Sequence, residues 1–191
     1  MINQAVFFPK VRADLFGGKL LQSQVEGLFA ILEEWERRNL ADLRWLAYIL
    51  ATAYWETAKT MQPIEEYGKG KGKPYGKVNE KTGKAYYGRG AVQVTWLSNY
   101  ARLSNEAQKQ KHEWDFINHP ELLLQMKPSI WATFHGMLTG LYTGKALDDY
   151  FNEEKELWVE ARRIINGKDK AVEIANIARR FYNILLASVK K

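Results

Sequence analysis

Apolar residues recur at helical spacing over much of the chain, with polar residues between them. The first such stretch predicts a helix that begins at Ser23, where Ser23 and Glu26 have the spacing of a capping box, and that ends near Asn39. The second predicts a helix that is capped by Asp42 and ends at Glu56-Thr57. Its apolar stripe consists of Leu43, Leu46, Ile49, Leu50 and Ala53.

After residue 100 the same spacing predicts further helices. They cover a polar stretch (101–113), a stretch opened by Pro128 that is apolar almost all round, a short stretch (158–165) stopped by Asn166-Gly167, and an amphipathic stretch (171–189). Residues 1–22 are mixed, and Phe7-Phe8-Pro9 and Phe16-Gly17-Gly18 predict an irregular lead-in there. Since no repeat or low-complexity linker forces a boundary, the pattern predicts a single domain, residues 1–191.

Composition limits the classes of protein and of site. With 191 residues, 46% of them hydrophobic, the chain can bury a core as one domain or as two small lobes around a cleft. It has no cysteine, and its three histidines lack metal-binding spacing, so we expect no disulfide, no metal and no cofactor. The net charge of +6 favours an anionic partner such as nucleic acid, anionic lipid or a cell-wall polymer.

The N-terminal residues and the apolar stretches bear on location. The first ten residues lack the basic start and the apolar run of a secretory signal. No apolar stretch reaches the ~20 residues that a membrane span requires. We therefore expect no membrane span, and a protein that stays in the cytoplasm until another protein releases it to the cell wall.

Three carboxyl side chains in the middle of the chain are candidates for acid–base chemistry. Glu56 falls within about 20° of Ile49 on the helical projection, at the flank of the apolar stripe. Apolar neighbours disfavour the charged form of a carboxyl, which suits a general acid; the alternative is a helix-end glutamate in solvent. Glu65 and Glu66 follow. Two carboxyls with aromatic and amide groups nearby are what cleavage of a bond between sugars requires.

A loop rich in lysine and glycine (68–83) follows the carboxylates. It lacks the spacing of a phosphate-binding loop, so we interpret it as a cationic rim that closes a hairpin through Lys81–Lys84. It either steers a substrate or is a solvated connector. Val92-Gln93-Val94-Thr95 then predicts a short strand or extended piece with Gln93 and Thr95 on one face.

The segment from Tyr86 to Trp96 reads Tyr-Tyr-Gly-Arg-Gly-Ala-Val-Gln-Val-Thr-Trp and is followed by Asn99-Tyr100. It resembles the Y-Y-G-R-G-P-[IV]-Q-[LV]-[ST] signature of glycoside hydrolase family 19, the plant-type chitinases and their bacterial and bacteriophage endolysin relatives. Segment 51–57 resembles the family's H-E-T segment, and 118–122 its N-P-[ED]-L turn. Segments 164–167 and 180–185 resemble its I-N-G-G segment and final helix. The matches run in order over residues 43–187.

The resemblance implies roles for individual residues. Glu56 takes the position of the general acid. Glu66 takes that of the base that activates water in an inverting displacement, with Glu65 as its rival, and Thr95 that of a hydroxyl that positions the water. Tyr87 and Arg89 belong to the floor of the cleft and its scaffold. The implied substrate-binding side chains are Gln93, Asn99, Asn166, Tyr87 and Trp55.

Three residues depart from the family pattern. Trp55 replaces the histidine before the acid, Ala91 replaces the proline, and Lys168 replaces the second glycine after Asn166. Trp55 either stacks on sugar or walls the acid. None of the three removes a catalytic carboxylate, so they affect fine specificity rather than the class of reaction.

The resemblance also implies a mainly α, lysozyme-like fold of two lobes with a small β-element and a long substrate cleft. The implied reaction is hydrolysis of a β-1,4 bond at an N-acetylhexosamine. We favour peptidoglycan over chitin because a cationic protein concentrates at an anionic wall. Plant members of the family are commonly secreted and disulfide-bonded, whereas this sequence has no cysteine and no secretory signal at its start. We therefore expect a phage or prophage endolysin, monomeric and without a nucleic-acid partner. A chitinase is one alternative, and a non-catalytic module that binds wall polymer or nucleic acid is another.

Overall fold

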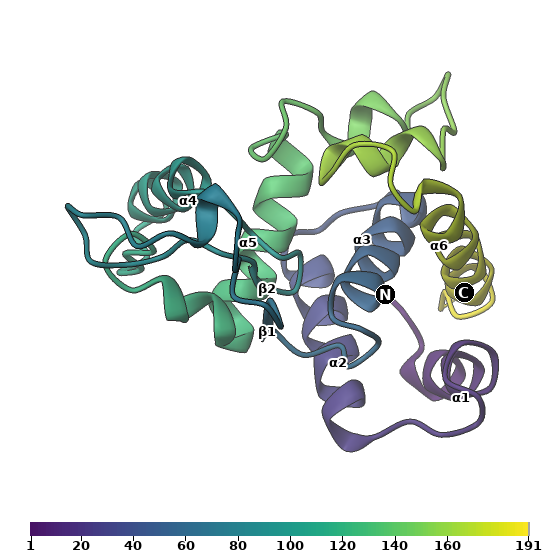
Figure 1. Ribbon diagram of the computed structural model, residues 1–191. Helices are drawn as coiled ribbons and strands as arrows, with labels where there is room; N and C mark the ends of the chain where they lie inside the picture. Colours follow the sequence, from purple (N-terminus) through teal and green to yellow (C-terminus); the bar gives the residue numbers. More distant parts are fainter. Residues whose placement is uncertain (191) are drawn as a thin grey trace.

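A computed structural model describes residues 1–190 and shows a mainly helical protein with one small sheet (Figure 1). Two short strands, β1 (Ile64–Glu65) and β2 (Arg89–Gly90), pair antiparallel, with Ile64 opposite Gly90 and Glu65 opposite Arg89. The predicted mainly α class with a small β-element is confirmed. The α-helices of the described chain are α1 (Gln4–Leu15), α2 (Gln22–Arg37), α3 (Leu43–Glu56), α4 (Leu97–Lys109), α5 (Met126–Thr139) and α6 (Ala171–Leu186). Short 3-10 helices are η1 (Pro74–Gly76), η2 (Pro120–Leu124), η3 (Leu147–Asp149) and η4 (Glu160–Ile164).

The helices form two groups with α5 between them (Figure 1). On one side α3 packs along α6, and α1 also packs on α6. On the other side lie α4, the β1–β2 sheet and the long loop between the strands. α5 contacts α2 and η2 and is buried on nearly every face, as predicted for the apolar stretch around Pro128. This arrangement agrees with the expected two lobes and makes α5 their shared core.

Residues 1–22 are not an irregular lead-in, because α1 occupies Gln4–Leu15. Asn3 caps this helix by accepting a hydrogen bond from the Ala5 N–H at 3.1 Å. Phe7, Val11 and Leu15 are buried at four-residue spacing, and α1 packs on α6. Pro9 has no N–H to donate within the helix, but burial of this stripe outweighs the loss. The prediction was wrong because it gave the proline more weight than the apolar spacing around it.

Side chains that accept backbone hydrogen bonds set the starts of α2 and α3. α2 begins one residue before Ser23, and Gln24, rather than Glu26, reaches back to accept from the Leu21 N–H at 2.8 Å. Leu21 has no polar side chain to return the bond, so only half of a capping box is present. α3 begins as predicted, with Asp42 accepting from the Arg44 N–H at 2.9 Å.

The signature segment contains a tight turn in place of the predicted strand. Arg89–Gly90 forms β2, the next residues turn, and Val94 pairs back with Arg89. Gln93 and Trp96 have φ values of 53° and 71°, which interrupt an extended strand and which alternation in the sequence does not reveal. The Ala91 N–H donates to the Ser129 hydroxyl at 2.8 Å, which fixes the turn to α5.

Other boundaries move by a few residues. α4 begins at Leu97, four residues before its predicted start, directly after the positive φ of Trp96. The stretch predicted over 158–165 forms only the short 3-10 helix η4. α6 ends at Leu186, because Val189 pairs with Ile2 and joins the two ends of the chain. Within residues 1–190, every helix is too short or too polar to cross a bilayer.

Candidate active site

A cavity of about 390 Å³ opens where the end of α3 meets β1 and the signature turn. A neighbouring hollow of about 290 Å³ shares much of its lining, and we call the two together the groove. The shared residues are Val92, Gln93, Thr95, Trp96, Ile165 and Asn166. The cavity adds Glu56, Glu66, Tyr75 and Gly88, and the hollow adds Val94, Asn99, Tyr142, Thr143 and Gly167.

Most of the predicted site residues lie at this groove. They come from the end of α3, from β1, from the signature turn, from α4 and from the turn after η4. The fold therefore brings together segments that are far apart in the sequence. The predicted residues that line the groove are Glu56, Glu66, Thr95, Gln93, Asn99 and Asn166; Trp55 and Tyr87 do not line it.

Three other hollows are of comparable or larger size. One of about 380 Å³ lies between α1 and α6 and contains Asp14, which is paired with Arg180 at 2.9 Å. One of about 370 Å³ lies at the chain ends beside α2 and contains a single carboxylate, Glu36. One of about 580 Å³ lies between α4 and α5 and contains Glu106, which is paired with Lys109 at 2.6 Å. Among residues 1–190, no group of three or more His, Asp or Glu side chains is arranged to hold a metal ion. Convergent polar chemistry rather than size therefore identifies the groove as the candidate site.

Glu56 faces a buried arginine. Its Oε1 atom lies 2.7 Å from Nη1 of Arg162, and the two side chains are 15% and 4% exposed. The two atoms are not aligned as hydrogen-bond donor and acceptor, so charge holds the pair together. Nε of Arg162 donates to the Asp169 carbonyl at 3.1 Å and orients the guanidinium. Contrary to the prediction from the sequence, Glu56 is therefore not flanked by apolar side chains alone. The Arg162 guanidinium lies beside it at the C-terminal end of α3, where the helix dipole is negative and a cation is favourable.

Glu66 and Glu65 are adjacent in sequence but have different surroundings. Glu66 lines the groove, where it accepts hydrogen bonds from the Gly88 N–H and the Tyr75 hydroxyl, both at 3.2 Å. Glu65 lies outside the lining; it is 2.9 Å from Lys69 Nζ and accepts from the Tyr87 hydroxyl at 2.9 Å. The hydrogen bond from Lys69, and then that from Tyr87, hold the pKa of Glu65 below its usual value. Of the two rivals, only Glu66 shares the cavity with Glu56.

The amides of the groove are partly committed to the backbone. Nε2 of Gln93 donates to the carbonyls of Ile64 and Gly90 at 2.9 and 3.1 Å, which ties β1 to β2. Nδ2 of Asn99 donates to the Thr95 carbonyl at 3.1 Å. Both side chains therefore keep an oxygen for a ligand. The Thr95 hydroxyl makes no hydrogen bond within residues 1–190.

Asn166 complements these two amides. Its Oδ1 accepts from the Gly167 N–H at 2.8 Å, so its NH₂ group is left as a donor. The groove therefore offers an exposed amide donor on one side and amide oxygens on the other. Sugar hydroxyls and acetamido groups, which both donate and accept, match such a lining.

Tyr87 and Arg89 stand behind the groove. The buried Arg89 guanidinium lies 3.7 Å from the centre of the Tyr87 ring and donates to the Ala85 carbonyl at 2.9 Å and the Tyr100 hydroxyl at 3.1 Å. Arg89 is therefore a buried, internal contact point behind the groove. Trp55 is half-buried against the core. Contact of Tyr87 and Trp55 with a substrate stays a prediction.

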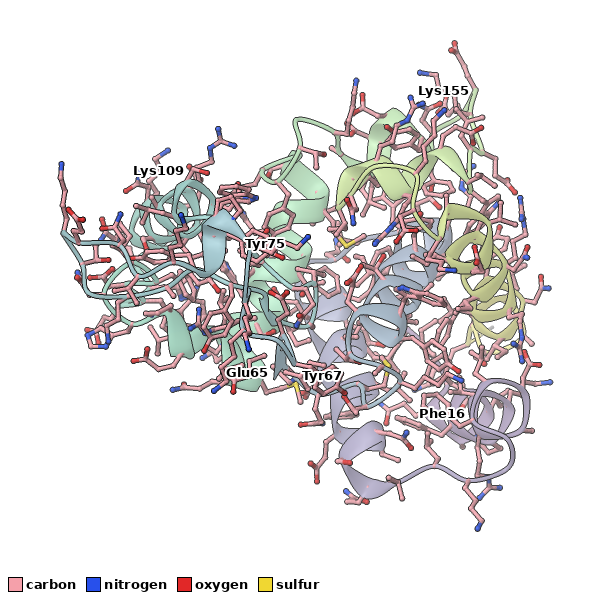
Figure 2. All side chains as sticks on the ribbon, in the orientation of Figure 1. Phe16, Glu65, Tyr67, Tyr75, Lys109 and Lys155 are labelled. Atoms are coloured by element: carbon pink, nitrogen blue, oxygen red, sulfur yellow. The ribbon has the colours of Figure 1, made fainter. Side chains whose placement is uncertain are left out.

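Three aromatic residues of the groove, Tyr75, Trp96 and Tyr142, were not among the predicted site residues. Tyr75 and Trp96 meet edge to face, with ring centres 5.4 Å apart, and the Trp96 side chain is 48% exposed. Figure 2 labels Tyr75 in the middle of the molecule, with Glu65 and Tyr67 below it. Burial and the neighbouring Glu66 raise the pKa of Tyr75, so its hydroxyl remains a hydrogen-bond donor. For Tyr75, the signal available in the sequence was an aromatic residue inside a loop of lysines and glycines.

The fold of the Lys/Gly loop (68–83) places Tyr75 at the groove. Its backbone crosses itself at Gly70 and Gly76, where a Cβ on Gly76 would lie 2.0 Å from the Gly70 oxygen. The Tyr86 N–H donates to the Tyr75 carbonyl at 3.1 Å. Farther along, two hydrogen bonds of 2.8 Å close a turn between Asn79 and Lys84, without the strands of the predicted hairpin. The loop therefore contributes Tyr75 to the lining of the groove, and its role in steering a substrate stays a prediction.

Comparison with known proteins supports a relationship to plant endochitinases. Over 135 residues the chain is 30% identical to an acidic endochitinase of Petunia hybrida, an alignment that covers 63% of this chain and 50% of that protein. Over 80 residues it is 36% identical to an endochitinase of Pisum sativum, covering 35% of this chain and 23% of that protein. The chain thus spans half or less of the length of these relatives. No family model matches it.

Proposed function

We propose that this protein is a glycoside hydrolase of the family 19 type that hydrolyses β-1,4 bonds of an N-acetylated glycan with inversion. The observation that carries this proposal is that Glu56 and Glu66 line one cavity while Glu65 lies outside it. In this reaction Glu56 protonates the leaving oxygen, and Glu66 takes a proton from the attacking water. The similarity to two plant endochitinases supports the same class of reaction.

The remaining lining fits the two other tasks of such an enzyme. The free Thr95 hydroxyl lies in the same cavity as both carboxylates and is suited to hold the water beside Glu66. The rings of Tyr75 and Trp96 offer faces to sugars, and Gln93, Asn99 and Asn166 offer amide groups. The ion pair with Arg162 holds the Glu56 carboxyl in place before the substrate arrives.

We propose peptidoglycan as the substrate. The net charge is +6, and the loop next to Glu66 carries exposed lysines that have no ion pair among the described residues, namely Lys71, Lys73, Lys77 and Lys81. Such a rim raises the local concentration of an anionic glycan. Chitin, which is neutral, is the second candidate, and the names of the two relatives favour it.

Mass spectrometry of soluble products decides between these substrates. The purified protein is incubated separately with peptidoglycan and with colloidal chitin. We expect disaccharide-peptides with a new reducing end from peptidoglycan, and the identity of the reducing sugar shows which bond is cut. Chitin oligomers alone would make the protein a chitinase. No product from either polymer would contradict the enzymatic proposal and favour a wall-binding module.

The loop lysines provide a sharper test of the anionic substrate. Replacing Lys71, Lys73 and Lys77 by Ser should lower activity on peptidoglycan far more than on a neutral chitin oligomer, and added salt should reduce the difference. The matched control replaces three exposed lysines elsewhere, Lys10, Lys19 and Lys155, with the same loss of charge. Equal losses in both triple variants, or on both substrates, would show that the loop lysines do not select an anionic substrate.

A further inference from the structure

The hollow between α4 and α5 has no role in the proposed reaction. At about 580 Å³ it is larger than the cavity that holds Glu56 and Glu66. Side chains of α4 form one wall, and residues from the end of α5 and the segment after it form the other. The lining includes Arg102, Asn105, Glu106, Lys109, His135 and Leu141.

This hollow continues the groove along α4. Asn99 lines the groove and Arg102, one helical turn later, lines the hollow; on the facing segment Tyr142 lines the groove and Leu141 the hollow. At the boundary between the two linings, Nη1 of Arg102 donates to the Leu141 carbonyl at 3.1 Å, so Arg102 stands at the end of the hollow nearest the groove. From Arg102 to Lys109 the helix rises by about 10 Å, which is the length that the hollow adds beside the groove along α4.

The chemistry of the hollow differs from that of the groove. Its lining contains no Trp or Tyr side chain among the described residues, whereas Tyr75, Trp96 and Tyr142 line the groove. A ring of a neutral glycan therefore has no aromatic face to stack on there. The hollow instead offers an exposed guanidinium and the amides of Asn105 and Gln108.

Arg102 is the available charge of the hollow. Beyond its bond to Leu141 it makes no hydrogen bond or ion pair within residues 1–190, so its other N–H groups are free. Glu106 and Lys109 neutralise each other at 2.6 Å. His135 forms the base, stacked on Trp131 at 4.9 Å, and burial lowers its pKa so that it is neutral at pH 7. A guanidinium with free N–H groups binds a carboxylate in preference to a neutral group.

We propose that this hollow is a distal subsite that binds a carboxylate-bearing substituent of the same glycan strand, with Arg102 as the residue that recognises the carboxylate. The inference rests on the proposed function, because it assigns the hollow to the strand that occupies the groove. The peptide stem of peptidoglycan is a substituent of this class. Chitin carries none, so the subsite distinguishes the two polymers.

Binding to a cleavage-deficient protein tests the subsite. In the Glu56→Gln background, Kd is measured for a soluble peptidoglycan strand that carries its peptide stems, for the same strand after removal of the stems, and for a chitin tetramer. Arg102→Gln should weaken binding of the stem-bearing strand by about tenfold and leave the other two within about twofold. Arg12→Gln on α1, an exposed arginine that removes the same charge, should change none of the three.

The site of binding is checked by NMR. The backbone amides of Asn105, Lys109 and Thr139 should shift with the stem-bearing strand and not with the chitin tetramer. Equal weakening by Arg102→Gln and Arg12→Gln, equal weakening for strands with and without stems, or no binding of the stem-bearing strand would each overturn the subsite.

The subsite and the enzymatic proposal fail separately. Cleavage of peptidoglycan by the wild-type protein together with Kd values that do not respond to Arg102→Gln would remove only the subsite. Absence of cleavage together with stem-dependent, Arg102-dependent binding would remove only the enzymatic proposal.

Discussion

The two carboxylates of the groove are held in opposite ways. Glu56 is the last residue of a helix that packs along α6, and its carboxyl faces the buried charge of Arg162. Glu66 follows a two-residue strand and is held by hydrogen bonds from Gly88 and Tyr75, two groups without charge. The position of Glu56 is fixed by a helix and an ion pair, and that of Glu66 by a loop and uncharged hydrogen-bond donors.

This difference matches the two tasks proposed for the carboxylates. A general acid must receive and return a proton at a fixed place. Glu56 is restrained there by the packing of α3 on α6 and by its charged partner Arg162. A base must point its oxygen at water, and the hydrogen bonds from Gly88 and Tyr75 orient the Glu66 carboxylate. Glu56 and Arg162, by contrast, are not aligned as a hydrogen bond. If the assignment is correct, changes on the Glu56 side should affect stability and catalysis together, and changes on the Glu66 side should affect mainly catalysis.

The largest effect is expected from removing either carboxylate. Glu56→Gln and Glu66→Gln should each lower kcat by about 10²–10⁴-fold, the usual contribution of a general acid or base. The assay is release of reducing ends from the polymer that the wild-type protein cleaves. Binding of the polymer should stay nearly intact in both variants.

Glu65→Gln is the matched control, because Glu65 is next in sequence and bonded to Lys69 and Tyr87 outside the groove. It should retain activity within a few fold. If Glu65→Gln loses as much activity as Glu66→Gln, the assignment of the base is reversed.

The next effect is on stability and belongs to the Glu56 side alone. Arg162→Gln leaves a half-enclosed carboxylate without its cation, and breaking a buried ion pair costs about 3–5 kcal/mol. The double variant Arg162→Gln/Glu56→Gln removes the lone charge and should recover part of that loss. Guanidinium denaturation measures both. A double variant no more stable than Arg162→Gln would show that Arg162 acts through packing and not through Glu56.

The sequence predicted the positions of the carboxylates better than their surroundings. Helical spacing and the Asp42 cap located α3 and its end at Glu56, because both signals are local. The sequence did not predict Arg162 as the partner of Glu56, since it lies more than a hundred residues away and reaches Glu56 only because η4 and α3 both pack on α6. The same holds for the hydrogen bond from Tyr75 to Glu66.

Errors arose where backbone conformation departs from residue preference. The strand expected over 92–95 failed at Gln93, whose positive φ no alternation of side chains announces. The lead-in expected over 1–22 failed because a proline was taken as a break where tertiary packing keeps a helix. Both errors concern segments that pack on α5 or α6, and such long-range packing is invisible to a local pattern.

A smaller effect is expected from Tyr75→Phe, which removes one donor to Glu66 and keeps the ring against Trp96. A hydrogen bond to a charged group contributes about 1.5–3 kcal/mol, and this one is long at 3.2 Å, so kcat should fall by about tenfold. KM and the denaturation midpoint should change little. Tyr67→Phe is the control, since Tyr67 is 85% exposed. A loss confined to KM would place Tyr75 in sugar binding and not in orientation of Glu66.

The smallest expected effect is a pH dependence of stability that differs between α4 and α5 on one side and α3 and α6 on the other. Burial lowers the pKa of His112 and His135, although Glu34 opposes this at His112 and Glu106 at His135. The unfolded chain then binds more protons than the folded one below the unfolded value of about 6.5, so stability is complete above that pH and declines as pH falls. The nearby cations act with burial: Arg37, Arg38 and Lys127 at His112, and Arg38 and Lys109 at His135.

The carboxyls with lowered pKa, such as Glu34 and Asp115, lose their contribution only at more acidic pH, below about 4.5. Between these limits His112 and His135 dominate, and both lie between α4 and the end of α5. Hydrogen exchange at pH 7 and pH 5, corrected for intrinsic rates, should therefore show lower protection in α4 and α5 and little change in α3 and α6. The variant His112→Asn/His135→Asn should flatten the decline. An equal loss of protection in α3 and α6 would contradict this prediction. It would mean that the part of the molecule holding Glu56 is no more stable at pH 5 than the part holding Glu66.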